Sequence, residues 1–247
     1  MERTISPVLM AETRKLPGSL TRLLAGFLAI ACWPSAAPAQ DKPLTAEAAL
    51  KRLKDGNARF VSDKVLKKDT GPAKRIELAQ GQRPIAVILT CADSRVAPEL
   101  IFNKGLGDLF VLRVAGNVAD DAHGLLGSAE YAAGSLKVPL IVVMGHENCG
   151  AVKAALTGDP IPGNLGKLIK SIYVGKDLPK EKAKALAAAT RANAIRQAEL
   201  MLKQSSVLKE FADSGRVRIM PAVYSLTTGE VTWLEPVKTR GHAPKAK

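Results

Sequence analysis

Aromatic residues are scarce in this chain of 247 residues, which has five Phe, three Tyr and two Trp. Proteins that bind single-stranded nucleic acid combine a basic groove with aromatic side chains on which bases stack. The net charge of +13 could by itself suit a polyanion or an anionic membrane surface. The cations are scattered, however, and no basic stretch has aromatic residues between its charges. The sequence therefore predicts a solvated basic surface and no nucleic-acid partner.

Apolar runs long enough to span a bilayer are also missing from the sequence. The apolar run at residues 23–31 is too short, and Ala37-Pro38-Ala39 after it has the form of a signal-peptide cleavage site. Four basic residues precede this run: Arg3, Arg14, Lys15 and Arg22. We expect residues 1–39 to be a cleaved secretory signal peptide, which predicts a periplasmic protein with no stable membrane anchor. An uncleaved anchor and acylation at Cys32 are the alternatives.

Cysteine is rare as well, and Cys32, one of only three, belongs to the predicted signal peptide. The mature chain would keep Cys91 and Cys149, too few for the disulfide scaffold of a small secreted domain. These two could be buried apolar residues, a single disulfide or metal ligands. Metal coordination would hold both as thiolates in an oxidising compartment.

The hydrophobic pattern predicts one α/β domain over residues 40–237, followed by a basic, disordered tail at residues 238–247. Loss of the signal peptide would remove four cations and two anions, which lowers the charge from +13 to about +11. The predicted strands are 85–90, 109–114, 140–144, 216–225 and 230–235. The predicted helices are one that starts at an N-cap Thr45, then 126–136, 151–156, and one or two within 180–209. This alternation predicts a mostly parallel central sheet of four strands plus an edge strand, flanked by helices.

Reactive side chains follow two of the predicted strands at the point where each strand ends. Cys91, Asp93 and Arg95 follow the first strand, and His146 and Cys149 follow the third. Open α/β sheets bind ligands at the carboxyl ends of their strands. Thiolate and imidazole suit zinc, and three protein ligands with one open position are typical of a catalytic zinc. The sequence thus predicts a zinc ion that activates water.

The predicted helix at residues 151–156 begins next to the second cysteine of this site. Its dipole and free amide groups would favour a thiolate and a bound anion, so we assign Gly150, at this end, to the substrate side. His123 and His242 have no neighbouring ligand residues and are expected to face solvent. The sequence contains no internal repeat and no Gly-rich phosphate loop.

The two motifs together, Cys91-x-Asp93-Ser94-Arg95 and His146-x-x-Cys149-Gly150, resemble those of the β-class carbonic anhydrases. The resemblance runs from about residue 44 to residue 234. In that family the first Cys, the His and the second Cys bind zinc. The resemblance implies reversible hydration of carbon dioxide to bicarbonate and a proton through zinc-bound hydroxide. It also implies a homodimer or a tetramer, since the family's sites lie at dimer interfaces.

The resemblance assigns further roles around the zinc. Asp93 and Arg95 correspond to the family's dyad, in which the Asp would accept a hydrogen bond from the hydroxide and the Arg would keep it ionised. Gln82, nine residues before the first Cys, corresponds to the Gln that contacts substrate. Phe110 and Tyr131 match the aromatic residues that line the pocket in the plant-like subgroup.

Regulation, closure of the zinc and the reaction itself could each differ from the family pattern. Ile88 stands where the bicarbonate-regulated subgroup has Trp, so that regulation is not expected. In some members the Asp closes the zinc as a fourth ligand at low pH, and the sequence does not decide this for Asp93. The rival functions are another zinc hydrolase on the same scaffold, such as a carbon disulfide hydrolase, and a zinc- or anion-binding protein without turnover.

Overall fold

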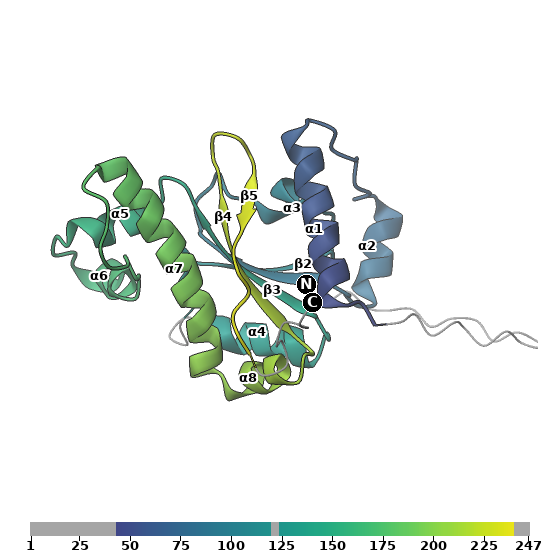
Figure 1. Cartoon of the computed structure of the whole chain (residues 1–247). Helices are drawn as coiled ribbons and strands as arrows, with labels where there is room; N and C mark the ends of the chain where they lie inside the picture. The colour runs from purple at the N-terminus through teal and green to yellow at the C-terminus, as the bar shows by residue number, and fades with distance from the viewer. Residues whose placement is uncertain (1–42, 120–123, 240–247) are drawn as a thin grey trace, which may run out of the picture. The chain divides into compact units, whose positions relative to one another are not determined.

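A five-stranded sheet forms the centre of the fold, in the order β2-β1-β3-β4-β5 (Figure 1). The computed structural model describes residues 43–119 and 124–239. The strands are β1 (Ala86–Thr90), β2 (Leu109–Arg113), β3 (Leu140–His146), β4 (Arg218–Tyr224) and β5 (Val231–Trp233). The first four are parallel, and β5 runs antiparallel to β4 at the edge. The predicted fold class is confirmed.

Several predictions fall on residues outside the described ranges. These are the signal peptide at residues 1–39, most of the tail at residues 238–247, and the solvent-facing positions of His123 and His242. The boundaries of the domain therefore stay predictions.

Helices precede the first strand and lie in the connections that follow it. They are α1 (Ala46–Val61), α2 (Pro72–Ala79), α3 (Pro98–Ile101), α4 (Leu125–Gly134), α5 (Gly150–Thr157), α6 (Gly163–Lys170), α7 (Lys182–Gln204) and α8 (Ser206–Asp213), with a short 3₁₀ turn η1 (Ala115–Asn117). The Thr45 hydroxyl accepts a hydrogen bond from the Ala48 amide at 3.1 Å, which confirms the predicted N-cap of α1. The predicted segment 180–209 divides at Ser205, whose hydroxyl caps α8 by accepting from the Leu208 amide at 3.0 Å.

Every residue of β1 and β3 is buried, because helices cover both faces of the sheet. Successive residues of β1 point to opposite faces, so Ile88 packs with α1 and α3, while Val87 and Leu89 pack with α4, α7 and α8. Each such side chain contributes about 1.5–3 kcal/mol by leaving water. This explains why both strands are uninterrupted apolar runs rather than alternating patterns.

Helix α6 was not predicted, because two glycines lower the helix propensity of its short sequence. Gly166 is required by packing, since a Cβ atom at this position would lie 1.8 Å from the Ile161 carbonyl oxygen. Pro221 lies inside β4, where a proline could remove a hydrogen bond from the sheet, but its position avoids this loss. Its carbonyl accepts from the Leu234 amide at 3.0 Å, so its nitrogen also faces the β5 side and the ladder to β3 loses no donor.

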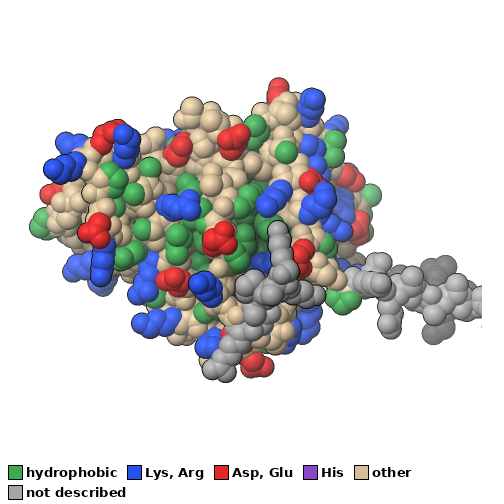
Figure 2. Space-filling model, viewed as in Figure 1, with side chains coloured by type: hydrophobic (Ala, Val, Ile, Leu, Met, Phe, Trp, Pro, Cys, Tyr) green, Lys and Arg blue, Asp and Glu red, His purple; other side chains and the backbone are tan. Residues whose placement is uncertain are grey.

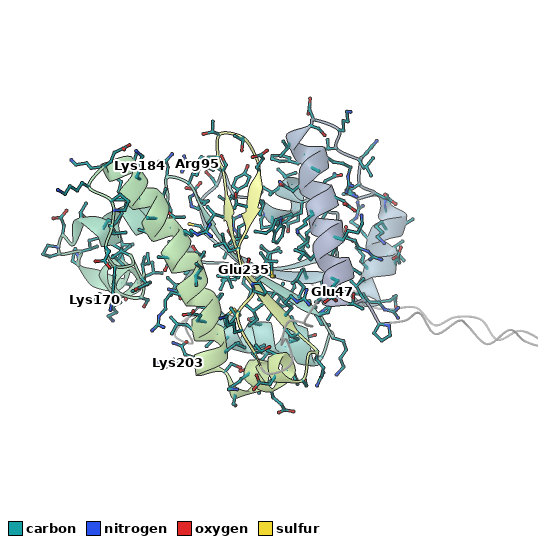
Figure 3. The ribbon with its side chains drawn as sticks, in the orientation of Figure 1. Glu47, Arg95, Lys170, Lys184, Lys203 and Glu235 are labelled. Atoms are coloured by element: carbon teal, nitrogen blue, oxygen red, sulfur yellow. The ribbon has the colours of Figure 1, made fainter. Side chains whose placement is uncertain are left out.

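The strand order fixes where a ligand can bind. The chain passes from β1 to β2 on one side and then returns past β1 to form β3 on the other. The carboxyl ends of β1 and β3 thus form a topological switch point, where open α/β sheets have their binding crevice. Arg95, which follows β1, lies in the view of Figure 3 at the same end of the molecule as Lys184, near the start of α7, and away from Lys203.

The surface agrees with a solvated basic protein. On the face shown in Figure 2, Lys and Arg side chains are scattered among Asp and Glu side chains around a hydrophobic area in the middle of the view. Within residues 43–119 and 124–239, no helix has both the length and the apolar character needed to cross a membrane.

Candidate metal centre

Three potential metal ligands meet at the switch point. One ligand atom from each of Cys91, His146 and Cys149 lies within 4.8 Å of the other two, and all three residues are buried. Cys91 directly follows β1, His146 is the last residue of β3, and Cys149 is the N-cap of α5. Both cysteines are free thiols, so the disulfide alternative does not describe this structure. The predicted convergence of the three side chains is confirmed.

The imidazole of His146 is oriented by a backbone group. Its Nδ1 lies 2.8 Å from the carbonyl oxygen of Glu147, which can only accept, so Nδ1 carries the proton. Nε2 is therefore the atom with a free lone pair, and it is buried with no hydrogen-bond partner in the described part of the chain. An unsatisfied buried polar atom costs about 1–3 kcal/mol. A metal ion at Nε2 would remove that cost, so the donor set fits zinc.

Glu147 also anchors the end of β3 through its side chain. Its carboxylate accepts hydrogen bonds from the Ser225 hydroxyl at 2.8 Å and from the Leu226 amide at 3.1 Å. Its own amide donates to the Tyr224 carbonyl at 2.9 Å. These contacts hold Glu147, the residue whose carbonyl orients the His146 ring.

The two thiols differ in proton affinity. A hydrogen bond from Cys149 lowers the pKa of Cys91 to about 4; burial opposes this shift, and contacts with His146 and the Gly116 amide add to it. The same contact with Cys91, together with burial, raises the pKa of Cys149. Without metal, the hydrogen-bonded pair therefore shares one proton near neutral pH. Metal binding has to displace that proton, because the thiolate is the ligand form.

Asp93 and Arg95 form the predicted ion pair. Arg95 Nε donates to Asp93 Oδ1 at 2.9 Å and Nη2 donates to Oδ2 at 2.7 Å, while the Arg95 amide adds a bond to Oδ1 at 3.0 Å. The hydrogen bonds from Arg95 hold the pKa of Asp93 well below its usual range, although burial opposes them. Oδ2 lies 3.8 Å from His146 Nε2. An ionised carboxylate thus faces the place that a metal would occupy.

Arg113 was not predicted to belong to the site. It is the last residue of β2, and its Nε donates to the Cys91 carbonyl at 3.0 Å while Nη2 donates to the Asp93 carbonyl at 2.6 Å. The guanidinium therefore fixes the backbone that carries the first cysteine and the carboxylate. The available signal was its position, since a cation at the end of the strand beside β1 lies at the same edge of the sheet.

Gly116 is a second residue that the sequence analysis did not assign to the site. Its amide donates to Cys91 Sγ at 3.3 Å, and its backbone is left-handed, with φ 72°. A Cβ atom would lie 2.5 Å from Ile172 Cδ1, so only glycine fits at this position without displacing that side chain.

The residues assigned to the substrate side lie outside the cluster of Cys91, His146 and Cys149. Gln82 is exposed and lines a cavity of about 430 Å³ together with Asp108 and other residues. The rings of Phe110 and Tyr131 are 6.2 Å apart, and Tyr131 is half exposed. Gly150 is exposed at the start of α5, beside Cys149. The contact of these four residues with substrate stays a prediction.

Comparisons with known proteins agree with this geometry. The sequence profile of the family described as "Carbonic anhydrase" matches residues 86–231. A carbonic anhydrase of Mycolicibacterium smegmatis is 42% identical over 192 residues, which cover 74% of this chain and 91% of that protein. Among solved structures, the β-carbonic anhydrase of Coccomyxa in complex with acetazolamide is 26% identical, with a TM-score of 0.61, over 78% of this chain and 82% of that one.

A second solved structure supports the fold alone. A tetrameric β-carbonic anhydrase from Sordaria macrospora is 23% identical, with a TM-score of 0.62, over 68% of this chain and 89% of that one. The matched profile covers more than half of this sequence and includes Cys91, His146 and Cys149. The chain therefore belongs to the β-carbonic anhydrase family and is a carbonic anhydrase, a lyase.

Proposed function

We propose that this protein hydrates carbon dioxide reversibly with a zinc ion held by Cys91, His146 and Cys149. The observation that carries the proposal is the buried Nε2 of His146, which has no hydrogen-bond partner among the described residues and lies beside two free thiols, with an ionised carboxylate 3.8 Å away. Zinc bound there supplies a Lewis acid that makes water a nucleophile near neutral pH, as in the carbonic anhydrases with three His ligands.

Asp93 has the geometry to orient the nucleophile. Its carboxylate accepts a hydrogen bond from the attacking oxygen, which leaves a lone pair directed at the carbon of carbon dioxide. Arg95 serves this role indirectly, because its two bonds fix the carboxylate plane and keep Asp93 ionised. A site that only stored zinc would not need an oriented carboxylate at this place.

The substrate side is proposed to be completed by a second copy of the chain. Gln82 and Tyr131 are exposed, and the homologue from Sordaria macrospora is described as tetrameric. Gln82 would donate to a substrate oxygen as negative charge develops on it, and Phe110 and Tyr131 would form an apolar wall for carbon dioxide. Sedimentation of the purified protein tests this assembly, and a monomer with full activity would contradict it.

Export to the periplasm is part of the same proposal. The mature protein is expected to begin at Gln40 in the periplasm, after cleavage behind Ala39. Mass spectrometry of the protein recovered from a periplasmic extract tests this cleavage. Recovery of the uncleaved chain in the cytoplasmic fraction would refute it.

Stopped-flow measurement of carbon dioxide hydration tests the enzymatic proposal. The zinc-loaded protein is assayed from about pH 6 to about pH 9, with the same protein after zinc removal as a control. We expect a rate that rises with pH through one midpoint and that disappears with the metal. No hydration in a sample with one zinc per chain would refute the proposal and redirect the search to other substrates.

A further inference from the structure

We propose that Asn193, on α7, is a positioning residue for the metal centre and acts through Gly116. It holds the turn whose amide donates to Cys91 Sγ, and so it sets how much negative charge this sulfur gives to the metal. The inference rests on the proposed zinc site and adds to it a residue that touches neither metal nor substrate.

Two consecutive hydrogen bonds connect the helix to the sulfur. Asn193 Nδ2 donates to the Gly116 carbonyl at 2.8 Å, and the Gly116 amide donates to Cys91 Sγ at 3.3 Å. Asn193 is fully buried, with an exposed fraction of 0%. Because Asn193 is 77 residues from Gly116 in the chain, only the tertiary fold brings them together.

The orientation of the Asn193 amide is determined by its other partners. Its Oδ1 accepts from the Tyr173 amide at 3.1 Å and from Gln197 Nε2 at 3.0 Å. Both partners are donors, so the oxygen has to face them, which leaves Nδ2 directed at Gly116. Gln197, one helical turn later, adds a bond from the Ala119 amide to its Oε1 at 2.9 Å. Two neighbouring amides on α7 thus hold both ends of the turn.

The turn needs this support because its backbone is strained. Gly116 and Asn117 are left-handed in succession, with φ values of 72° and 47°. For Asn117, which is not a glycine, such a conformation is unfavourable and persists only where its surroundings enforce it. Asn193 supplies this constraint at the Gly116 carbonyl. Without that bond, the backbone torsion angles of Gly116 could change, and its amide could turn away from the sulfur.

The expected consequence is electronic. A hydrogen bond to a thiolate withdraws charge from the sulfur, so the sulfur donates less to a metal ion. A metal with two thiolate ligands is a weaker Lewis acid than one with three imidazoles, and the Gly116 amide offsets part of that difference. Loss of the amide should therefore make the metal less acidic and the Cys91–metal bond more covalent.

The test uses full-length protein reconstituted with Co²⁺, whose thiolate-to-metal charge-transfer band reports the charge on the sulfur. Asn193→Ala removes the donor to Gly116, and Asn193→Asp removes it while keeping the volume and the acceptor. The matched control is Thr190→Val, also buried on α7, since the Thr190 hydroxyl has no hydrogen-bond partner within the described residues.

We expect the charge-transfer band of both Asn193 variants to move to longer wavelength. The pH midpoint of kcat/KM of the zinc enzymes should rise by up to about one unit, while Thr190→Val leaves band and midpoint in place. Variants that bind one metal per chain with an unshifted band and midpoint would overturn the inference. If neither Asn193 variant folds, the wild-type cadmium-loaded protein tests the Gly116–Cys91 hydrogen bond on which the inference depends. Absence of scalar coupling between the Gly116 amide proton and the metal through Cys91 Sγ would refute that bond and overturn the inference.

The two proposals fail in different ways. Wild-type protein that shows neither the thiolate band with Co²⁺ nor hydration with Zn²⁺ refutes the proposed function. A normal wild-type band that Asn193→Ala does not shift refutes only the role of Asn193.

Discussion

Arg113 gives a quantitative test of how the site is positioned. Its guanidinium spans the Cys91 and Asp93 carbonyls with bonds of 3.0 and 2.6 Å. Lysine keeps the charge at this position, but its single ammonium group lacks the planar fork that reaches two acceptors in fixed geometry. Arg113→Lys thus tests geometry rather than charge.

The magnitude follows from the number of bonds lost. A hydrogen bond from a charged donor contributes about 1.5–3 kcal/mol, and the lower limit applies because the Arg113 side chain is exposed. Lysine can still make one of the two bonds, so about 1.5 kcal/mol of positioning is lost. Since 1.36 kcal/mol corresponds to a factor of ten in rate, we expect kcat/KM to fall by roughly tenfold.

The assay is stopped-flow hydration of carbon dioxide by zinc-loaded protein, with zinc content measured on the same sample. Arg191→Lys, an exposed change on α7, is the matched control and should retain wild-type kcat/KM. An Arg113→Lys enzyme with full zinc content and unchanged kcat/KM would show that the turn after β1 keeps its geometry without this clamp.

Three further predictions concern the carboxylate, the metal and the N-terminal helix. Asp93→Asn should lower the rate of hydration by a factor of about 10² or more with zinc retained, because the amide is a weaker hydrogen-bond acceptor than the carboxylate. Asp159→Asn, in an exposed loop, is the control. Near-normal activity of Asp93→Asn would refute the role of Asp93. Zinc binding near neutral pH should release about one proton per chain, because the Cys91 and Cys149 thiols share one proton in the metal-free protein. Calorimetry in buffers of different ionisation enthalpy measures the released protons, and a value near two would contradict the shared proton. Asn57→Ala should lower the free energy of unfolding, measured in urea, by about 2–4 kcal/mol, because the Asn57 side chain makes hydrogen bonds with the backbone of Ile101, Gly229 and Val231. A loss below about 1 kcal/mol would mean that water replaces these bonds.

The sequence was sufficient for the parts of the structure that depend on local pattern. The buried strands β1 and β3 are apolar up to their last residues, and ligand residues lie at or shortly after the end of each, so both the sheet and the Cys91–His146–Cys149 cluster were predictable. The Thr45 cap could be read in the same way, since its partner lies three residues away.

The supporting contacts could not be read from the sequence, because their partners are distant in the chain. Arg113 bonds a carbonyl 22 residues away, and Asn193 bonds one 77 residues away. Asn193 and Gln197 lie in the Ala-rich α7 and are polar residues of the kind expected on the solvent-facing side of a helix, yet both are fully buried. Sequence pattern identifies groups that react, whereas groups that only orient them become recognisable once the fold is known.

The placement of the ligands at the ends of β1 and β3 also affects how the protein resists unfolding. A metal held by Cys91 and Cys149 cross-links the chain across everything between them, including the edge strand β2 and helix α4. In the chain-entropy picture, a covalent link closing a loop of this length restricts the unfolded ensemble by on the order of 4 kcal/mol. The zinc ion would thus restrain the segment that contains β2 and β3, and a chelator would loosen the edge strand β2 as well as stop the reaction.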